Sequence, residues 1–203
     1  MKKIIKTTSQ KRAREIMVHM FGINDAIKHF RVNPTRRQVA ALSEIPFTEM
    51  ILKECRKTHI LVAVFPISIR KIRGDHAKLF YHDDPPGLEE ELFAEKGKTE
   101  WRLIRKTPVR NSTSKTWYEQ YGLLSDDEDV PEVRVMVYAI IGHFLATGER
   151  LFEKIFVVCA DMIENYNIYI NFGSDGFFTG LHLWDEHRDD NVGISSARNP
   201  SKH

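Results

Sequence analysis

The sequence predicts an α+β fold, with several short helices in an α-rich N-terminal half and a central mixed or antiparallel sheet that ends in a C-terminal β-meander. One long amphipathic helix, over about residues 131–147, is expected to pack on this sheet. An apolar stripe with a 3.6-residue period predicts the helix, and Gly148 stands where helices commonly end. The stripe comprises Val133, Met136, Val137, Ile140, Ile141, Phe144 and Leu145.

Two further patterns predict the strands of the sheet. Residues 60–65 form a continuous apolar run rich in β-branched side chains, which is typical of a strand buried on both faces. Residues 166–172 alternate between the two faces of a strand, with Asn167, Tyr169 and Asn171 on the wetter face. Both segments are therefore expected in the sheet.

The meander is predicted from the segments around this alternating strand. Residues 155–160 precede it, and the turn 173–176 connects it to a partner strand over 177–184. Residues 192–197 are a candidate edge strand.

Length and composition indicate an ordinary globular protein. We expect residues 1–203 to form a single domain, with 1–57 as a candidate helical subdomain and with 1–8 and 198–203 as tails. Hydrophobic residues make up 42% and charged residues 29%, so disorder is not expected. The formal net charge of +2 gives the whole molecule no strong attraction to nucleic acid or to an anionic membrane.

The cysteines and the apolar runs bear on the cellular location. Cys55 and Cys159 lie inside apolar segments, so both are expected to be buried, reduced thiols. The sequence has no signal-peptide pattern and no apolar run of about 18 residues. We therefore expect a soluble, cytoplasmic protein without a membrane partner.

Short helical patterns fill the N-terminal half. Ile16, Met17 and Met20 have helical spacing after about Ser9, with Gly22 as the expected stop. Asn24 is the expected cap of a second short helix.

Residues 35–57 have the outline of a helix-turn-helix. Thr35 and Gln38 form a capping-box pattern, and Pro46 suits the first turn of a second helix. DNA binding is therefore one alternative function, with a basic N-terminal arm beside the two helices. Glu44 in the turn and Lys53 at an expected apolar position weaken the match, and two short packed helices occur in many α-rich domains. The candidate DNA-contacting residues are Lys11, Arg12, Arg14, Arg36 and Arg37.

The central segments carry few functional signals. Residues 74–99 are expected to form a flap or surface loop, and 101–106 a half-exposed strand. The polar turn 111–115 is expected to cap a helix that carries Trp117 and Tyr121, and the acids at 125–129 to complement the dipole of the long helix. His143 lies beside the apolar stripe, so we interpret it as a packed rather than a catalytic residue.

Ligand-type side chains are densest at the end of the predicted strand 177–184 and in the residues that follow it. His182, Asp185 and His187 could hold a divalent metal ion, because imidazole and carboxylate groups suit zinc, manganese or iron. They converge only if the chain turns at Asp185. A metal-dependent hydrolase is therefore a second alternative function, and a polar strand end that runs into a charged loop is the competing interpretation.

Catalytic and cofactor motifs do not appear in the sequence. G-x-S-x-G, G-x-G-x-x-G, H-E-x-x-H and P-loop patterns are all missing, so no catalytic or cofactor-binding residue is assigned. The function that fits best is a soluble, non-enzymatic binding or accessory protein. Its partner would be another protein or an unidentified ligand, with nucleic acid as the alternative.

Overall fold

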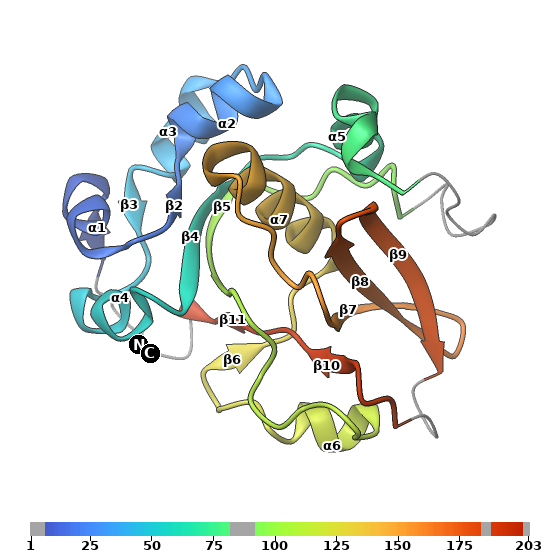
Figure 1. Ribbon diagram of the computed structural model, residues 1–203. Helices are drawn as coiled ribbons and strands as arrows, with labels where there is room; N and C mark the ends of the chain where they lie inside the picture. The colour runs from blue at the N-terminus through green and yellow to red at the C-terminus, as the bar shows by residue number, and fades with distance from the viewer. Residues whose placement is uncertain (1–6, 82–91, 184–187, 201–203) are drawn as a thin grey trace.

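The computed structural model describes residues 7–81, 92–183 and 188–200 (Figure 1). It confirms the α+β class and the C-terminal meander. The helices are α1 (Gln10–Ile16), α2 (Ile23–Phe30), α3 (Arg36–Ala41), α4 (Glu49–Cys55), α5 (Ile69–Asp75), the 3-10 helix η1 (Ala77–Leu79), α6 (Trp117–Tyr121) and α7 (Val133–Thr147). The strands are β1 (Thr8–Ser9), β2 (Met20–Phe21), β3 (Glu44–Ile45), β4 (His59–Val64), β5 (Glu100–Arg105), β6 (Glu128–Asp129), β7 (Phe156–Ile163), β8 (Tyr166–Gly173), β9 (Gly176–Leu183), β10 (Val192–Ile194) and β11 (Ala197–Arg198).

The described strands form two larger sheets and one two-stranded pair. The five-stranded sheet has the order β2-β4-β5-β11-β6, the four-stranded sheet has the order β10-β7-β8-β9, and β1 pairs with β3. The pairs β2–β4 and β10–β7 are parallel, and the other pairs are antiparallel. Every residue of β4 is buried, which confirms the strand predicted from the apolar run.

Helix α7 lies between the two larger sheets (Figure 1). It packs against β2 and β4 of one sheet and against β7 and β8 of the other, so residues 133–143 are buried around the whole helix. The predicted apolar stripe is thus only part of its buried surface. The Tyr138 hydroxyl donates a 3.0 Å hydrogen bond to the Ala63 carbonyl, and Gly148 ends the helix with a φ of 77°, as predicted. None of the helices in the described ranges has the length and apolar character needed to cross a bilayer.

Several helix ends in the N-terminal half differ from the sequence prediction. Helix α1 already ends at Ile16, and Gly22 is the N-cap of α2 rather than the stop of α1. Helix α4 begins after Thr48, whose hydroxyl accepts from the Ile51 amide at 3.3 Å, so Pro46 lies outside it. The Thr48 side chain satisfies a backbone amide of the first helical turn, and a proline side chain has no group that can do so. The Thr35–Gln38 capping box is confirmed.

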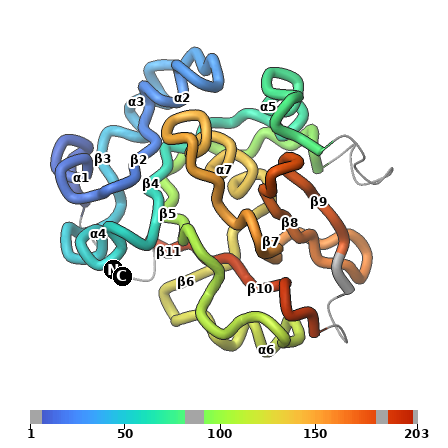
Figure 2. The backbone as a smooth tube through the Cα atoms, in the orientation of Figure 1, coloured from blue at the N-terminus to red at the C-terminus, as the bar shows by residue number. Residues whose placement is uncertain are grey.

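The C-terminal segment connects the two larger sheets. Strand β10 extends the four-stranded sheet, and β11 then enters the five-stranded sheet between β5 and β6 (Figure 2). Thr8 and Arg198, which the sequence prediction places in tails, therefore both belong to strands.

The acids before α7 also differ in role from the prediction. Glu128 pairs with Arg105 at 2.9 Å, Asp127 pairs with Arg198, and Asp129 accepts from the Asn199 amide. These acids therefore bind partners around the five-stranded sheet. A different carboxylate, that of Asp161, accepts from the Val133 amide in the first turn of α7 at 2.5 Å.

Candidate functional site

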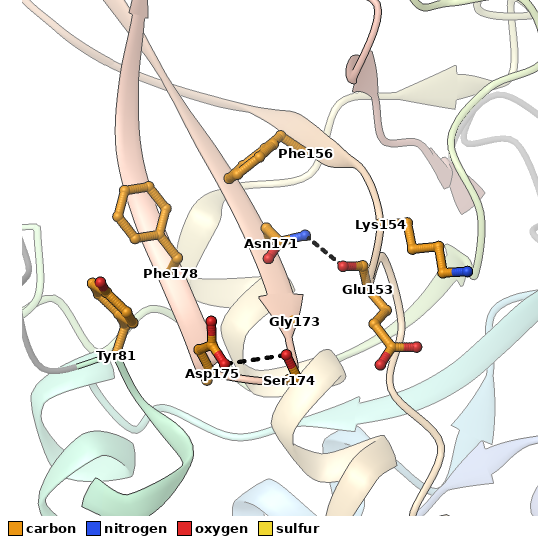
Figure 3. Close-up of a pocket in the computed structure, with 10 residues that line it drawn as sticks. Tyr81, Glu153, Lys154, Phe156, Asn171, Gly173, Ser174, Asp175 and Phe178 are labelled. Atoms are coloured by element: carbon orange, nitrogen blue, oxygen red, sulfur yellow. Dashed lines mark hydrogen bonds between the residues drawn. The ribbon is translucent and has the colours of Figure 1, made fainter.

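A pocket lies at the hairpin end of the meander (Figure 3). Its volume is about 540 Å³, within the range of roughly 300–1,000 Å³ that small-molecule sites occupy. Its walls come from the β8–β9 hairpin, from the segment that leads into β7 together with the first residue of β7, and from Tyr81, which follows η1 by two residues. The lining residues are Tyr81, Glu153, Lys154, Phe156, Asn171, Gly173, Ser174, Asp175, Gly176 and Phe178.

One wall of the pocket is aromatic. The ring centroid of Phe178 lies 5.9 Å from that of Tyr81 and 6.0 Å from that of Phe156, both in edge-to-face geometry. Tyr169 packs behind them, 5.0 Å from Phe156. Gly180 permits this packing, because a Cβ there would lie 2.7 Å from the Tyr169 ring and 2.8 Å from the Phe178 ring.

Gly176 brings Tyr81 to the hairpin. The Tyr81 amide donates a 2.9 Å hydrogen bond to the Phe177 carbonyl. Gly176 has a φ of 126°, and a Cβ there would stand 2.9 Å from the Tyr81 amide nitrogen. The glycine is therefore required both by its own backbone conformation and by the close approach of the second chain segment.

Asn171 fixes the opposite rim. Its side-chain amide donates to the carbonyls of Phe152, Glu153 and Ile155 at 2.7, 3.2 and 3.2 Å. These bonds hold the segment that carries Glu153 and Lys154 against β8. The rim is thus positioned by a side chain of the sheet.

The charged groups of the rim are unevenly placed. Glu153 and Asp175 contribute two carboxylates, and Asp175 accepts a 3.2 Å hydrogen bond from the Ser174 hydroxyl. In Figure 3 the Lys154 side chain extends away from the Tyr81–Phe178 pair, with its amino group at the far side of the view. Asp175 is therefore the charged group beside the Tyr81–Phe178 pair, whereas Glu153 and Lys154 lie together on the opposite rim.

A second group of chemically active side chains lies around the C-terminal end of α7. His19, His143 and Glu149 each offer a ligand-type atom, and these atoms lie within 4.8 Å of one another. The Lys106 ammonium is 3.0 Å from His19 Nε2 and 3.3 Å from Glu149 Oε1. Burial lowers the pKa of His143, which is 2% exposed, and burial together with the Lys106 charge lowers the pKa of His19. Both imidazoles are therefore neutral near pH 7.

Among the predicted metal ligands, only the backbone of His182 is described, and it lies away from the pocket. The backbone of His182 is in β9 opposite Asn167, whereas the pocket is at the hairpin end of the same strand. Asp185 and His187, and the side chain of His182, lie outside the described residues. A metal site there stays a prediction.

The predicted DNA-contacting residues are divided between two helices. Lys11, Arg12 and Arg14 lie on α1, where the Arg12 guanidinium is 2.9 Å from Glu15 and 3.0 Å from Glu49. Arg36 and Arg37 are exposed on α3, a helix without a buried residue. Strand β3 lies between α3 and α4, and α4 packs against α1. DNA binding therefore also stays a prediction.

Sequence reasoning missed both groups. The wetter face of the 166–172 strand, with Tyr169 and Asn171, was the available signal for the pocket. His19, Lys106 and Glu149 stand in no motif, and His143 was interpreted only as a packed residue.

Comparisons of the chain with family models, curated proteins and solved structures give no match. The function of the protein must therefore be inferred from the geometry of these sites.

Proposed function

We propose that this protein is a non-enzymatic binding protein, and that the hairpin pocket holds a small organic cation with a flat or apolar body. The observation that carries the proposal is the wall of Tyr81, Phe156 and Phe178, with the Asp175 carboxylate beside it and the Glu153 carboxylate on the opposite rim. A cytoplasmic location, as expected from the sequence, is part of the proposal.

The aromatic wall supports a flat, positively charged ligand. Aromatic faces carry negative potential, and a cation over such a face gains about 0.5 to 2 kcal/mol, depending on its desolvation. Rings also contribute large apolar contact area at a low entropy cost.

The rim supports the same charge preference. Glu153 and Asp175 can each accept a hydrogen bond from an ammonium group, and the Ser174–Asp175 bond holds one of these carboxylates in place. A charge-assisted bond of this kind is roughly twice as strong as a neutral one. An anionic ligand would meet the like charge of Asp175 beside the rings and that of Glu153 on the opposite rim, with only Lys154 in its favour.

The lining favours binding over catalysis. Among the described residues, it contains carboxylates, one ammonium group and the hydroxyls of Ser174 and Tyr81, but neither an imidazole nor a thiol. The Ser174 hydroxyl donates to the adjacent Asp175 carboxylate at the exposed hairpin tip, but no third side chain among the described lining residues is shown to orient this pair for nucleophilic attack.

A matched pair of probes tests the proposal. Tryptamine and indole-3-acetate share one ring system and carry opposite charges. Calorimetric titration is expected to show tryptamine binding at least tenfold more tightly to the full chain. Equal affinity for the two probes, or no tryptamine binding at millimolar concentration, would overturn the proposal.

Three variants locate the binding. Asp175→Asn is expected to reduce the preference for tryptamine, and Phe178→Leu to weaken both probes. Glu54→Gln removes one exposed carboxylate from α4, away from the pocket, and should leave both affinities unchanged.

A further inference from the structure

The cluster around His143 is assembled from three distant chain segments. His19 directly precedes β2, and its carbonyl accepts from the Leu61 amide at 3.2 Å, which fixes it beside the five-stranded sheet. His143 lies on the last part of α7, and its ring is 5.0 Å from that of His19. Glu149 follows the glycine that ends the helix.

The helix end positions Glu149 over His143. Gly148 adopts a left-handed conformation, and Glu149 Oε2 comes to 2.9 Å from His143 Nε2. The Thr147 hydroxyl accepts from the Glu149 amide at 3.1 Å and donates to the His143 carbonyl at 2.8 Å. The backbone of Glu149 is thus held by hydrogen bonds at the helix end, although its side chain is 46% exposed.

The donor set is suited to a transition-metal ion. Two imidazoles and one carboxylate hold zinc in several metalloenzymes, and the same set serves iron. Ligands at zinc distances of about 2.0–2.2 Å stand roughly 3–4 Å apart from one another. The observed donors, within 4.8 Å of one another, therefore require only a small contraction.

The protonation states also fit a metal ion. Both imidazoles are held neutral, which is the ligating form. Burial opposes ionisation of Glu149, but hydrogen bonds from His143 and Lys106 lower its pKa below the ordinary value. Its carboxylate is therefore charged near pH 7.

The Lys106 ammonium contacts two of the three donor groups, His19 Nε2 and Glu149 Oε1. An ammonium group only donates, so His19 Nε2 must accept from it with the lone pair that a metal would bind. The Lys106 backbone is fixed by a 2.8 Å bond from its amide to the Thr58 carbonyl, but its four-carbon side chain can rotate.

We propose that His19, His143 and Glu149 form a binding site for a divalent transition-metal ion, and that the Lys106 ammonium competes with this ion for His19 and Glu149. The site is independent of the hairpin pocket and does not rest on its function. Zn²⁺ suits the two-imidazole donor set, whereas Mg²⁺ prefers all-oxygen ligands.

Removal of the competing ammonium is the decisive test. Zn²⁺ titration of the full chain by calorimetry is expected to show at least tenfold tighter binding for Lys106→Met than for the wild type. Mg²⁺ should bind neither protein tightly. Equal Zn²⁺ affinity in the two proteins would contradict the competition.

A double variant separates this site from the other histidines of the chain. His19 is only partly buried, so His19→Gln is compatible with folding. The Lys106→Met, His19→Gln protein is expected to lose the tight Zn²⁺ binding, whereas Lys106→Met, His29→Gln retains it. Tight binding that survives the loss of His19 would overturn the proposal.

Cobalt provides a spectroscopic check on the same proteins. Co²⁺ in a four- or five-coordinate site of nitrogen and oxygen donors gives visible absorption that the hexahydrated ion lacks almost entirely. This band is expected with Lys106→Met and should disappear in the variant that also carries His19→Gln. A band that is absent from Lys106→Met would show that the three side chains do not converge on one ion.

Discussion

Arg105 on β5 and Glu128 on β6 form a partly buried ion pair across the five-stranded sheet, with Nη2 2.9 Å from Oε1. Strand β11 lies between these two strands, and the Ser196 hydroxyl beside it donates to the same oxygen at 2.9 Å. The Ser125 hydroxyl donates to Oε2 at 2.7 Å. A carboxylate that is only 4% exposed thus binds groups from three chain segments.

Glu128 should make the fold sensitive to strong acid. Burial opposes its ionisation, but hydrogen bonds from Ser125, Arg105 and Ser196 lower its pKa from 4.5 to about 2. Because the folded-state pKa is depressed, the stabilisation is fully present above pH 4.5 and is lost as the pH falls toward 2. We expect Glu128→Gln to lower the free energy of unfolding at pH 7 by about 3 kcal/mol and to flatten its decline between pH 4.5 and 2.

Urea unfolding at a series of pH values measures both effects. Glu54→Gln, an exposed substitution on α4, is the matched control and should reproduce the wild-type curve. Wild-type and Glu128→Gln curves that run parallel between pH 4.5 and 2 would refute the assigned pKa.

His59 should produce a separate loss of stability at milder pH. It is 2% exposed, and burial followed by the charges of Arg105 and Arg198 lowers its pKa from 6.5 to about 4. The unfolded chain therefore binds a proton between pH 6.5 and 4 that the folded chain excludes, so stability falls as the pH decreases through this window. The whole effect corresponds to about 3 kcal/mol.

His59→Leu is expected to remove this dependence. The substitution also eliminates a buried Nε2 atom that has no hydrogen-bond partner among the described residues. Its free energy of unfolding should therefore rise relative to the wild type between pH 6.5 and 4. NMR titration of the wild-type imidazole gives an independent reading, and a His59 pKa near 6.5 would contradict the prediction.

The sequence predicted those parts of the fold that local patterns determine. The stripe and final glycine of α7, the Thr35–Gln38 capping box and the alternation in residues 166–172 each depend on neighbours within a few positions. Such interactions are formed by the same residues in nearly any tertiary context. The structure contains all three, except that Asn167, predicted on the wetter face of this strand, is fully buried.

The candidate sites could not be predicted in this way because their residues meet only after folding. Tyr81 reaches the hairpin through a backbone bond to Phe177, and His19 reaches His143 across the sheet. Each pair is separated by about a hundred residues or more, and neither has a local spacing rule. Arg105 was likewise predicted only as part of a half-exposed strand. Glu128 was predicted only as an acid that complements the dipole of the long helix.

A glycine in α7 should be more stabilising than alanine, against the usual helix preference. Gly→Ala in a helix normally gains about 1 kcal/mol. At Gly142, however, a Cβ would lie 3.0 Å from the Phe21 ring and 3.2 Å from the Phe30 ring. These rings pack against each other and against Tyr138, so they cannot move freely.

We therefore expect Gly142→Ala to lower the free energy of unfolding by about 1–3 kcal/mol, as overpacking does. Gly74 in α5 is the control, since nothing lies within 4 Å of its added Cβ and Gly74→Ala should be stabilising. Thermal and urea unfolding of the two variants compare the signs directly. Stabilisation by both substitutions would show that the Phe21 and Phe30 rings adjust without cost.

Gly180 should control the aromatic wall of the pocket without touching its charged rim. A Cβ at this position would lie 2.7 Å from Tyr169 Cζ and 2.8 Å from Phe178 Cε1, closer than real Cβ contacts occur. Both rings must therefore shift in Gly180→Ala, and Phe178 is the ring shared by the two edge-to-face contacts of the wall. We expect tryptamine affinity to fall about tenfold, because a loss of about 1.4 kcal/mol of stacking and cation–π energy corresponds to that factor.

The control for Gly180→Ala is Gly122→Ala at the end of α6. An added Cβ there meets only the carbonyls of Tyr118 and Glu119, at 3.4 and 3.6 Å, and the backbone φ of −65° suits alanine. Near-UV circular dichroism should report the shifted tyrosine environment in Gly180→Ala alone. If the spectrum changes while tryptamine affinity does not, the rings move but do not contact the ligand, and the binding site must then lie at the carboxylates of Glu153 and Asp175.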